Sequence, residues 1–452
     1  MTDLDRDAAQ ALTLLDDLVR RAMAGGATAA DALYVGGSSV SATVRLGRQE
    51  KLERAEGGEI GLRVLIGHRQ ALVASADTSP ATLATLVERA LDMARVVPED
   101  PHVGLADPAD LALERPDIDG CDPGEVSVET LTRLVETLEG EALAVPGVTN
   151  SEGAEASWGR STVALVGSNG FSHAYHSSHV GLGVAVVAGQ GTEGMEIDHA
   201  SASAVYLADL RDPAEVGREA GTRAVRRLGA TRLPTKTRPV VFDPRVARGL
   251  VGHLLGAING GSIARGTSFL KDSLGQRILP AGVSVIEDPH RPRGLRSRPV
   301  DAEGLPTRRR SLVDDGTLTT WLLDLRTARV LGLKSTGHAS RGTGAPPSPG
   351  ASNVWLTPGP LSPAELIAGI DDGLYVTDLF GQGVNGLTGD YSRGAAGLRI
   401  ENGVLTTPVN EVTIAGTLQR MFAALTPASD LELRHGVDAP TVLVGEMMVA
   451  GA

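Results

Sequence analysis

The stretch STVALVGSNGFSHAYHSSHVGLGVAVVA, residues 161–188, decides the fold class. Its two strand-like runs, 161–166 and 171–188, are separated by Ser168-Asn169-Gly170. Asn-Gly is a strong short-range signal for a β-hairpin, because both central residues of the tight turn need a positive φ. The stretch therefore predicts two antiparallel strands joined by a tight turn.

Helical and strand-like patterns are segregated in the residues around this hairpin. Apolar residues recur at helical spacing in 7–24, 80–96, 126–143 and 213–228, whereas 30–76 alternates like a set of strands. Segregated helices and hairpins, unlike alternating ones, predict an α+β fold with antiparallel sheets.

A polar segment punctuated by prolines, residues 231–239, marks the main domain boundary. We predict an N-terminal α+β domain at 1–232 and a hairpin-rich, mainly antiparallel β domain at 233–452. The second domain opens with a helix at Asp243-Pro244, an N-cap and first-turn pair.

Composition excludes several classes of protein. The 452 residues carry a formal net charge of −13, and the one dense basic run, 308–310, is followed closely by Asp314 and Asp315. Nucleic-acid binding needs clustered surplus basic charge, so we expect none. The single cysteine, Cys121, and an N-terminus without a basic and apolar leader predict a cytoplasmic protein that does not bind membranes.

Two short motifs suggest chemistry that their surroundings do not support. Residues 381–386, GQGVNG, match G-x-G-x-x-G, but a dinucleotide site needs a helix next, and 387–394 is rich in turn-forming residues. We predict a structured glycine-rich loop there. Residues 268–271 match S-x-x-K, but the companion motifs Ser-Asp-Asn and Lys-Thr-Gly are missing.

Two clusters are candidates for metal binding. His173, His176 and His179 fall on a predicted strand, where alternation separates them too far for one ion. The acidic segments 287–290 (EDPH) and 301–303 (DAE) could bind a hard cation through oxygens, although such clusters are more often solvated turns.

Several segments together resemble one family, the PmbA/TldE branch of the TldD/PmbA family. The resemblance covers nearly the whole chain. The segments are Gly61–Val64, Pro98–Asp100, Leu279–Val283, Glu287–Pro289, Asp301–Gly304, Trp321–Asp324, Ser335–Ala339 and Gly383–Ala395.

The resemblance implies a pair of related subunits that degrade or mature unfolded peptides, a family also called modulators of DNA gyrase. The TldD-type subunit carries H-E-x-x-x-H on a helix, plus a cysteine. Two imidazoles and a thiolate hold Zn²⁺, and the glutamate takes a proton from the zinc-bound water.

The corresponding helix, 247–258, lacks this set. Its only histidine is His253, with Leu254 and Ile258 at the remaining motif positions. Alignment on the segment 266–268 instead puts Val251, Gly252 and Gly256 there. We therefore expect no metal in this chain and zinc in a TldD-like partner.

From this resemblance we expect a non-metal-binding subunit of a TldD/TldE-type metallopeptidase assembly. It would pair with a TldD-like metalloprotease, close a chamber and help hold an extended peptide. Alone it would be inactive and would form a homodimer. The alternative is an independent hydrolase with a site near His290, Asp301 or His338.

The expected wall of the chamber is the glycine-rich loop, with Asn385, Asp390, Tyr391 and Arg393, together with His338. A second interpretation is that these polar side chains only fix the loop, through an Asx-type turn at Asp390 and an ion pair of Arg393.

Overall fold

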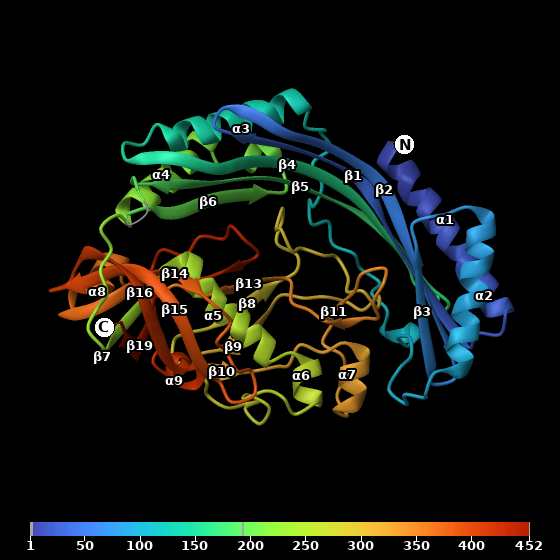
Figure 1. The fold of residues 1–452 in the computed structure, drawn as a ribbon. Helices are drawn as coiled ribbons and strands as arrows, with labels where there is room; N and C mark the ends of the chain where they lie inside the picture. The colour runs from blue at the N-terminus through green and yellow to red at the C-terminus, as the bar shows by residue number, and fades with distance from the viewer. Residues whose placement is uncertain (1–2, 192–193, 452) are drawn as a thin grey trace.

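The computed structural model describes residues 3–191 and 194–451 and has the expected α+β architecture (Figure 1). A long antiparallel sheet of six strands, in the order β3-β2-β1-β4-β5-β6, arches over the C-terminal half. Its strands are β1 (Ala29–Arg45), β2 (Arg48–Ile66), β3 (Arg69–Ser75), β4 (Val148–Gly167), β5 (Ser172–Ala188) and β6 (Glu196–Ala204).

The hairpin of β4 and β5 is confirmed, with a different turn from the one that the sequence suggested. Gly167 N donates to Phe171 O at 2.9 Å, which leaves a three-residue loop between the strands. Only Gly170 takes a positive φ, 91°. This is the pattern of a turn followed by one left-handed residue, so Asn169 keeps an ordinary backbone.

Four helices cover the outer face of this sheet (Figure 1). They are α1 (Asp3–Ala24), α2 (Pro80–Val96), α3 (Val128–Leu143) and α4 (Pro213–Arg226). Strand residues alternate between the two faces. Ala32 on β1 packs with the helices, whereas the next residue, Leu33, packs with Val300 of the C-terminal half.

The C-terminal half contains a sheet that closes on itself. Its order is β16-β15-β14-β7-β19-β17, and β16 also pairs with β19. All neighbours are antiparallel except β14 and β7. The strands are β7 (Lys236–Phe242), β14 (Asp372–Phe380), β15 (Asp390–Glu401), β16 (Val404–Thr417), β17 (Thr426–Pro427) and β19 (Val442–Ala450).

A smaller sheet, β10-β9-β8-β13-β18, lies beside it, and helix α5 (Pro244–Ala257) packs against both sheets. The side chain of Asp243 accepts from Arg245 N at 3.1 Å, so the expected N-cap is confirmed. The remaining elements are β8 (Val285–Asp288), β9 (Arg310–Asp314), β10 (Thr317–Leu318), β11 (Ala339–Ser340), β12 (Ser348–Pro349), β13 (Asn353–Leu356), β18 (Val437–Asp438), α6 (Gly260–Ala264), α7 (Leu325–Val330), α8 (Pro363–Ala368) and α9 (Leu418–Ala423).

The two short motifs have structural roles. The glycine-rich loop leads from β14 into β15 and not into a helix, as predicted. A Cβ at Gly383 would lie 1.8 Å from Ser392 O, so only glycine fits this contact. Ser268 is buried, and its hydroxyl donates to Ala257 O at 2.6 Å.

Buried charges join the two halves. Arg341 Nη1 donates to Asp31 Oδ1 at 2.6 Å, and Arg63 binds the same carboxylate from β2. Burial by itself raises the pKa of Asp31, but the two arginines outweigh burial and hold this pKa below its usual value. Among the described residues, no helix has the length and apolar character needed to cross a membrane.

Candidate functional site in the cleft beside helix α5

Helix α5 presents a bare face to solvent. One side carries buried apolar residues that belong to the C-terminal core. The other side exposes Gly249, Gly252 and Gly256, and a Cβ added at any of them would meet no atom within 4 Å. The helix backbone is therefore accessible along this face.

The residues present on α5 do not fit a zinc ion. Val251 is buried, and Gly252 and Gly256 have no side chain to ligate a metal. His253 packs edge-to-face on Tyr391, with 6.0 Å between the ring centroids. Over residues 3–191 and 194–451, no three His, Cys, Asp or Glu side chains form a group able to hold a metal ion.

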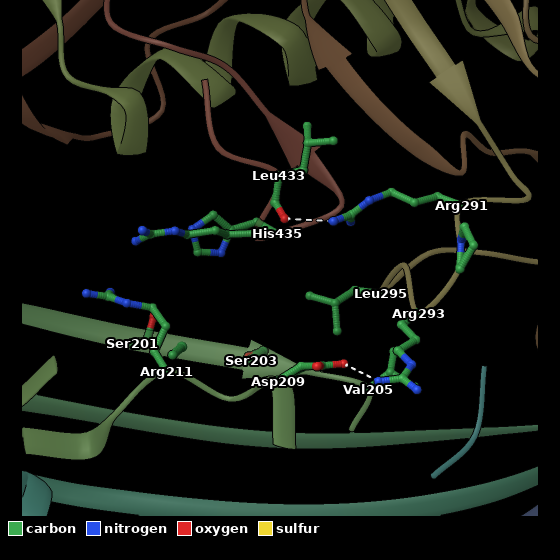
Figure 2. A pocket seen from close by; sticks show the side chains of 14 residues that line it. Ser201, Ser203, Val205, Asp209, Arg211, Arg291, Arg293, Leu295, Leu433 and His435 are labelled. Atoms are coloured by element: carbon green, nitrogen blue, oxygen red, sulfur yellow. Dashed lines mark hydrogen bonds and ion pairs between the residues drawn. The ribbon is translucent and has the colours of Figure 1, made fainter. Parts of the chain in front are cut away.

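A cleft runs from the bare face of α5 to the edge strand β6. It consists of adjoining hollows of about 500, 400 and 290 Å³. Arg248 and His435 line the first two, and Arg211, Arg434 and His435 line the last two, so the hollows are continuous. In Figure 2, Ser201 and Ser203 of β6 face the loops that carry Arg291 and His435.

Several arginines of the cleft are paired with carboxylates. Their partners come from both halves of the chain, so these pairs also hold the walls in place. The pairs are Arg211 with Glu219, Arg245 with Asp198, Arg293 with Asp119 and Asp209, and Arg434 with Glu432.

Three lining arginines have no carboxylate partner within the described part of the chain. Arg248 donates from Nε to the carbonyl of Arg245 at 3.2 Å. Arg291 donates from Nη2 to the carbonyl of Leu433 at 3.1 Å (Figure 2). The guanidinium of Arg296 makes no hydrogen bond to a described residue, and the side chain is exposed.

The predicted loop residues come together beside α5, but most of their hydrogen bonds stay inside the loop. The Asx-type turn forms at Asn385, which accepts from Leu387 N at 2.9 Å, and not at Asp390. Asp390 instead accepts from the hydroxyl of Thr388 at 2.6 Å. Arg393 donates to the carbonyl of Phe380 at 3.1 Å, and the ion pair of the second interpretation does not form with any described carboxylate.

Tyr391 is the one loop residue of this set that enters the core. Its side chain is buried, and burial raises its pKa to about 12, although Arg393 opposes the shift. Burial and the same Arg393 lower the pKa of His253. A neutral imidazole on an aromatic ring is a packing contact and not a ligand set.

His338 lies apart from this loop, in a buried chain of hydrogen bonds. Nε2 donates to Glu287 Oε2 at 2.6 Å, and Nδ1 accepts from Thr336 Oγ1 at 2.7 Å. Burial lowers the pKa of His338 despite Glu287. Burial by itself raises the pKa of Glu287, but the hydrogen bonds from His338 and Ser352 outweigh burial and lower this pKa to about 2. A neutral imidazole that donates to a carboxylate agrees with the lowered pKa of His338 and with the lowered pKa of Glu287.

The acidic segments are interior, so the expectation of solvated turns is wrong. Asp301 accepts from Glu303 N and Leu305 N, both at 2.9 Å, and burial raises its pKa. His290 bonds to Thr307 at 2.8 Å and not to Asp301. His290, Asp301 and His338 therefore have separate partners and do not form a common site.

Sequence reasoning missed the cleft arginines. Arg248 belongs to α5, Arg291 and Arg296 to one loop, and His435 to another. Arg291 and Arg296 belong to one basic stretch, 290–298 (HRPRGLRSR), whereas Arg248 and His435 join them only on folding. That stretch and the glycine spacing in 249–256, which marks a helix face without side chains, were the sequence signals.

Three family profiles match the chain. PmbA/TldA metallopeptidase domain 1 matches residues 30–94, the central domain matches 121–228 and the C-terminal domain matches 235–451. Metalloprotease PmbA of Escherichia coli O157:H7 is 40% identical over 417 residues, which cover 92% of this chain and 90% of the relative. A PmbA homolog of Haemophilus influenzae is 35% identical over 452 residues, covering 99% and 97%.

Solved structures share the whole fold. A Bacteroides thetaiotaomicron protein, described as a candidate modulator of DNA gyrase, gives a TM-score of 0.90 at 25% identity and covers 97% of this chain and 98% of its own. TldE from Thermococcus kodakarensis gives a TM-score of 0.85 at 20% identity, covering 96% and 99%, and shows the fold alone.

Proposed function

Because the chain belongs to the PmbA/TldD metallopeptidase family, we propose that it is the non-metal-binding subunit of a TldD/TldE-type assembly that degrades or matures unfolded peptides. The observation that carries this proposal is the bare face of α5. Where the TldD-type helix would present its ligands and base, this helix presents Gly252 and Gly256. The chain keeps the fold and supplies no catalytic set there.

In this proposal the chain acts by contact, in the cytoplasm, with a TldD-like partner that carries the zinc. The domains 1–232 and 233–452 form two walls of a peptide-holding chamber. The glycine-rich loop is a third, because Asn385, Asp390 and Arg393 fix its backbone while Phe380 and Leu387 remain exposed. Two exposed apolar side chains at a hydrogen-bonded loop suit contact with another chain or a peptide.

The test is co-purification of the tagged full-length chain from its native host. A TldD-like chain should come with it, and the complex should cleave labelled unfolded casein in a way that chelators abolish. The chain purified alone should be inactive. Hydrolysis by the isolated chain, without a partner, would instead support an independent hydrolase.

That second candidate has less support from the geometry. His338 and Asp301 are buried, and the side chain of each makes hydrogen bonds inside the protein. A general base must lie within hydrogen-bond reach of its substrate. Activity of the isolated chain that survives His338→Ala would also remove His338 from the candidates.

A further inference from the structure

The cleft beside α5 has a local charge that opposes the charge of the whole molecule. The chain has a formal net charge of −13, yet Arg248, Arg291 and Arg296 line the cleft without carboxylate partners in the described residues. His435 lines the same hollows as these arginines, and desolvation and then the guanidinium of Arg248 lower its pKa, although Asp438 opposes the shift. Acidic surroundings with a basic interior concentrate the attraction for anions in the cleft.

Most N–H donors of the three unpaired arginines make no hydrogen bond to a described residue. A guanidinium has five N–H donors in a fixed fork. The described residues take one donor from Arg248 and one from Arg291, in both cases through a backbone carbonyl. These single bonds hold the side chains in place and leave the other N–H groups to water or to a ligand.

The carboxylates that line the cleft lie mostly in its middle hollow. Asp209, which pairs with Arg293, lines the hollow of Arg291, and none of the described carboxylates lines the hollow of Arg248 and Arg296. Asp438 accepts from the backbone nitrogens of His435 and Gly436 at 2.9 and 3.2 Å. Asp430 accepts from the backbone and hydroxyl of Thr441 at 2.9 and 2.8 Å. Asp243 caps α5. These bonds hold the three carboxylates in the middle hollow, away from Arg291 and Arg296.

We propose that this cleft binds the carboxylates of an extended peptide, with Arg248, Arg291 and Arg296 as the anion-binding groups. Guanidinium and carboxylate pair through two parallel hydrogen bonds, which favours carboxylate over a neutral polar group. The carboxylate comes from the peptide C-terminus or from Asp and Glu side chains. The inference rests on the proposed function only in taking a peptide as the ligand.

The walls of the cleft suit an extended main chain. β6 is the edge strand of the first sheet, and residues 201–205 line the cleft consecutively. An edge strand offers N–H and C=O groups to a peptide that adds alongside it. At the other end of the cleft, the glycines of α5 let a backbone approach the helix closely.

The test is fluorescence anisotropy with the full-length chain alone. Three labelled octapeptides of neutral residues serve as probes. The first has a free C-terminus, the second is amidated and contains two glutamates, and the third is amidated without glutamate. The first or second should bind at least about tenfold more tightly than the third. The better of the two identifies the source of the carboxylate.

Variants then locate the site. Arg296→Gln should weaken the carboxylate peptide severalfold, and Arg248→Gln together with Arg296→Gln by about tenfold or more. Because Arg296 makes no side-chain bond to a described residue, its variant should fold normally. Arg277→Gln is the matched control, since Arg277 is an exposed arginine paired with Asp315 outside the cleft.

Equal binding of all three peptides would overturn the inference, as would unchanged affinity in the double variant. Displacement of the peptide by inorganic phosphate at lower concentration than by acetate would overturn the assignment to carboxylates. None of these readouts needs a partner chain. Failure here, with a TldD-like chain still co-purifying, would leave the proposed function intact.

Discussion

His253 and Tyr391 form an edge-to-face pair, at 83° between ring planes, which joins helix α5 to strand β15. His253→Ala should leave the zinc content of the purified chain unchanged and far below one per molecule. It should lower the free energy of unfolding by about 1 kcal/mol, from the lost ring contact. Elemental analysis and urea unfolding measure both. One tightly bound zinc per wild-type chain that is lost in the variant would contradict the prediction that His253 binds no metal.

The same substitution should leave partner-dependent peptidase activity nearly unchanged. The reason is that Leu254 and Ile258 offer His253 neither a base nor a second ligand. Turnover by the reconstituted complex is the measurement. A loss greater than about a hundredfold with folding intact would indicate general-base catalysis.

His338→Ala should lower the free energy of unfolding by about 3 kcal/mol. It removes one donor from the buried carboxylate of Glu287 and leaves that charge less compensated. Urea unfolding followed by circular dichroism measures the change. His68→Ala, on the exposed turn after β2, is the control and should stay within about 0.5 kcal/mol.

Asp31→Asn should be among the most destabilising single changes, at about 3–5 kcal/mol. It leaves the buried Arg63 and Arg341 without their shared carboxylate at the contact between the two halves. The matched control is Asp16→Asn, whose partner Arg20 is exposed on helix α1; that surface pair should contribute about 0.5 kcal/mol. Equal losses for the two variants would argue against a structural role for the buried charges.

Glu303→Gln should become more stable relative to the wild type as pH rises. Burial and then the neighbouring Asp301 raise the pKa of Glu303. A carboxyl whose pKa is raised in the folded state stabilises the fold below its unfolded pKa of about 4.3, and this contribution is lost as pH rises through the folded pKa. Gln keeps an acceptor for Leu325 N but does not ionise. Urea unfolding at about pH 5 and pH 8 gives the comparison. A stability difference that stays constant with pH would refute it.

The isolated chain should form a dimer that exchanges subunits with a TldD-like chain. A subunit that acts only by contact needs a permanent interface, and such interfaces usually bury more than about 2,000 Å². Light scattering at micromolar concentration and mixing with the partner test this. A persistent monomer that binds no TldD-like chain would remove the contact role.

The features that the sequence predicted correctly are local ones. Asp243-Pro244 and the hairpin around Gly170 are specified by residues within one or two turns of each other, so propensity and capping decide them. The glycine-rich loop was recognised as a loop for the same reason.

The interior of the C-terminal half was not predictable in this way. The acidic segment at Glu287 looked like a solvated turn because its donors, Ser352 and His338, lie more than fifty positions later. Arg291 and Arg296 are neighbours in sequence, but Arg248, which lines the same cleft, lies 43 positions before Arg291. Long-range packing decides whether such a polar residue is buried, paired or left free.

The closure of the C-terminal sheet has a consequence for synthesis on the ribosome. Val442 of β19 pairs with Phe242 of β7, so β7 lacks this neighbour until about 200 further residues have been made. At about 5–20 residues per second the wait is roughly 10–40 s, during which an apolar strand edge is unsatisfied. Nascent chains of this protein should therefore depend on ribosome-associated chaperones during that interval, and a stalled, truncated chain should aggregate through β7.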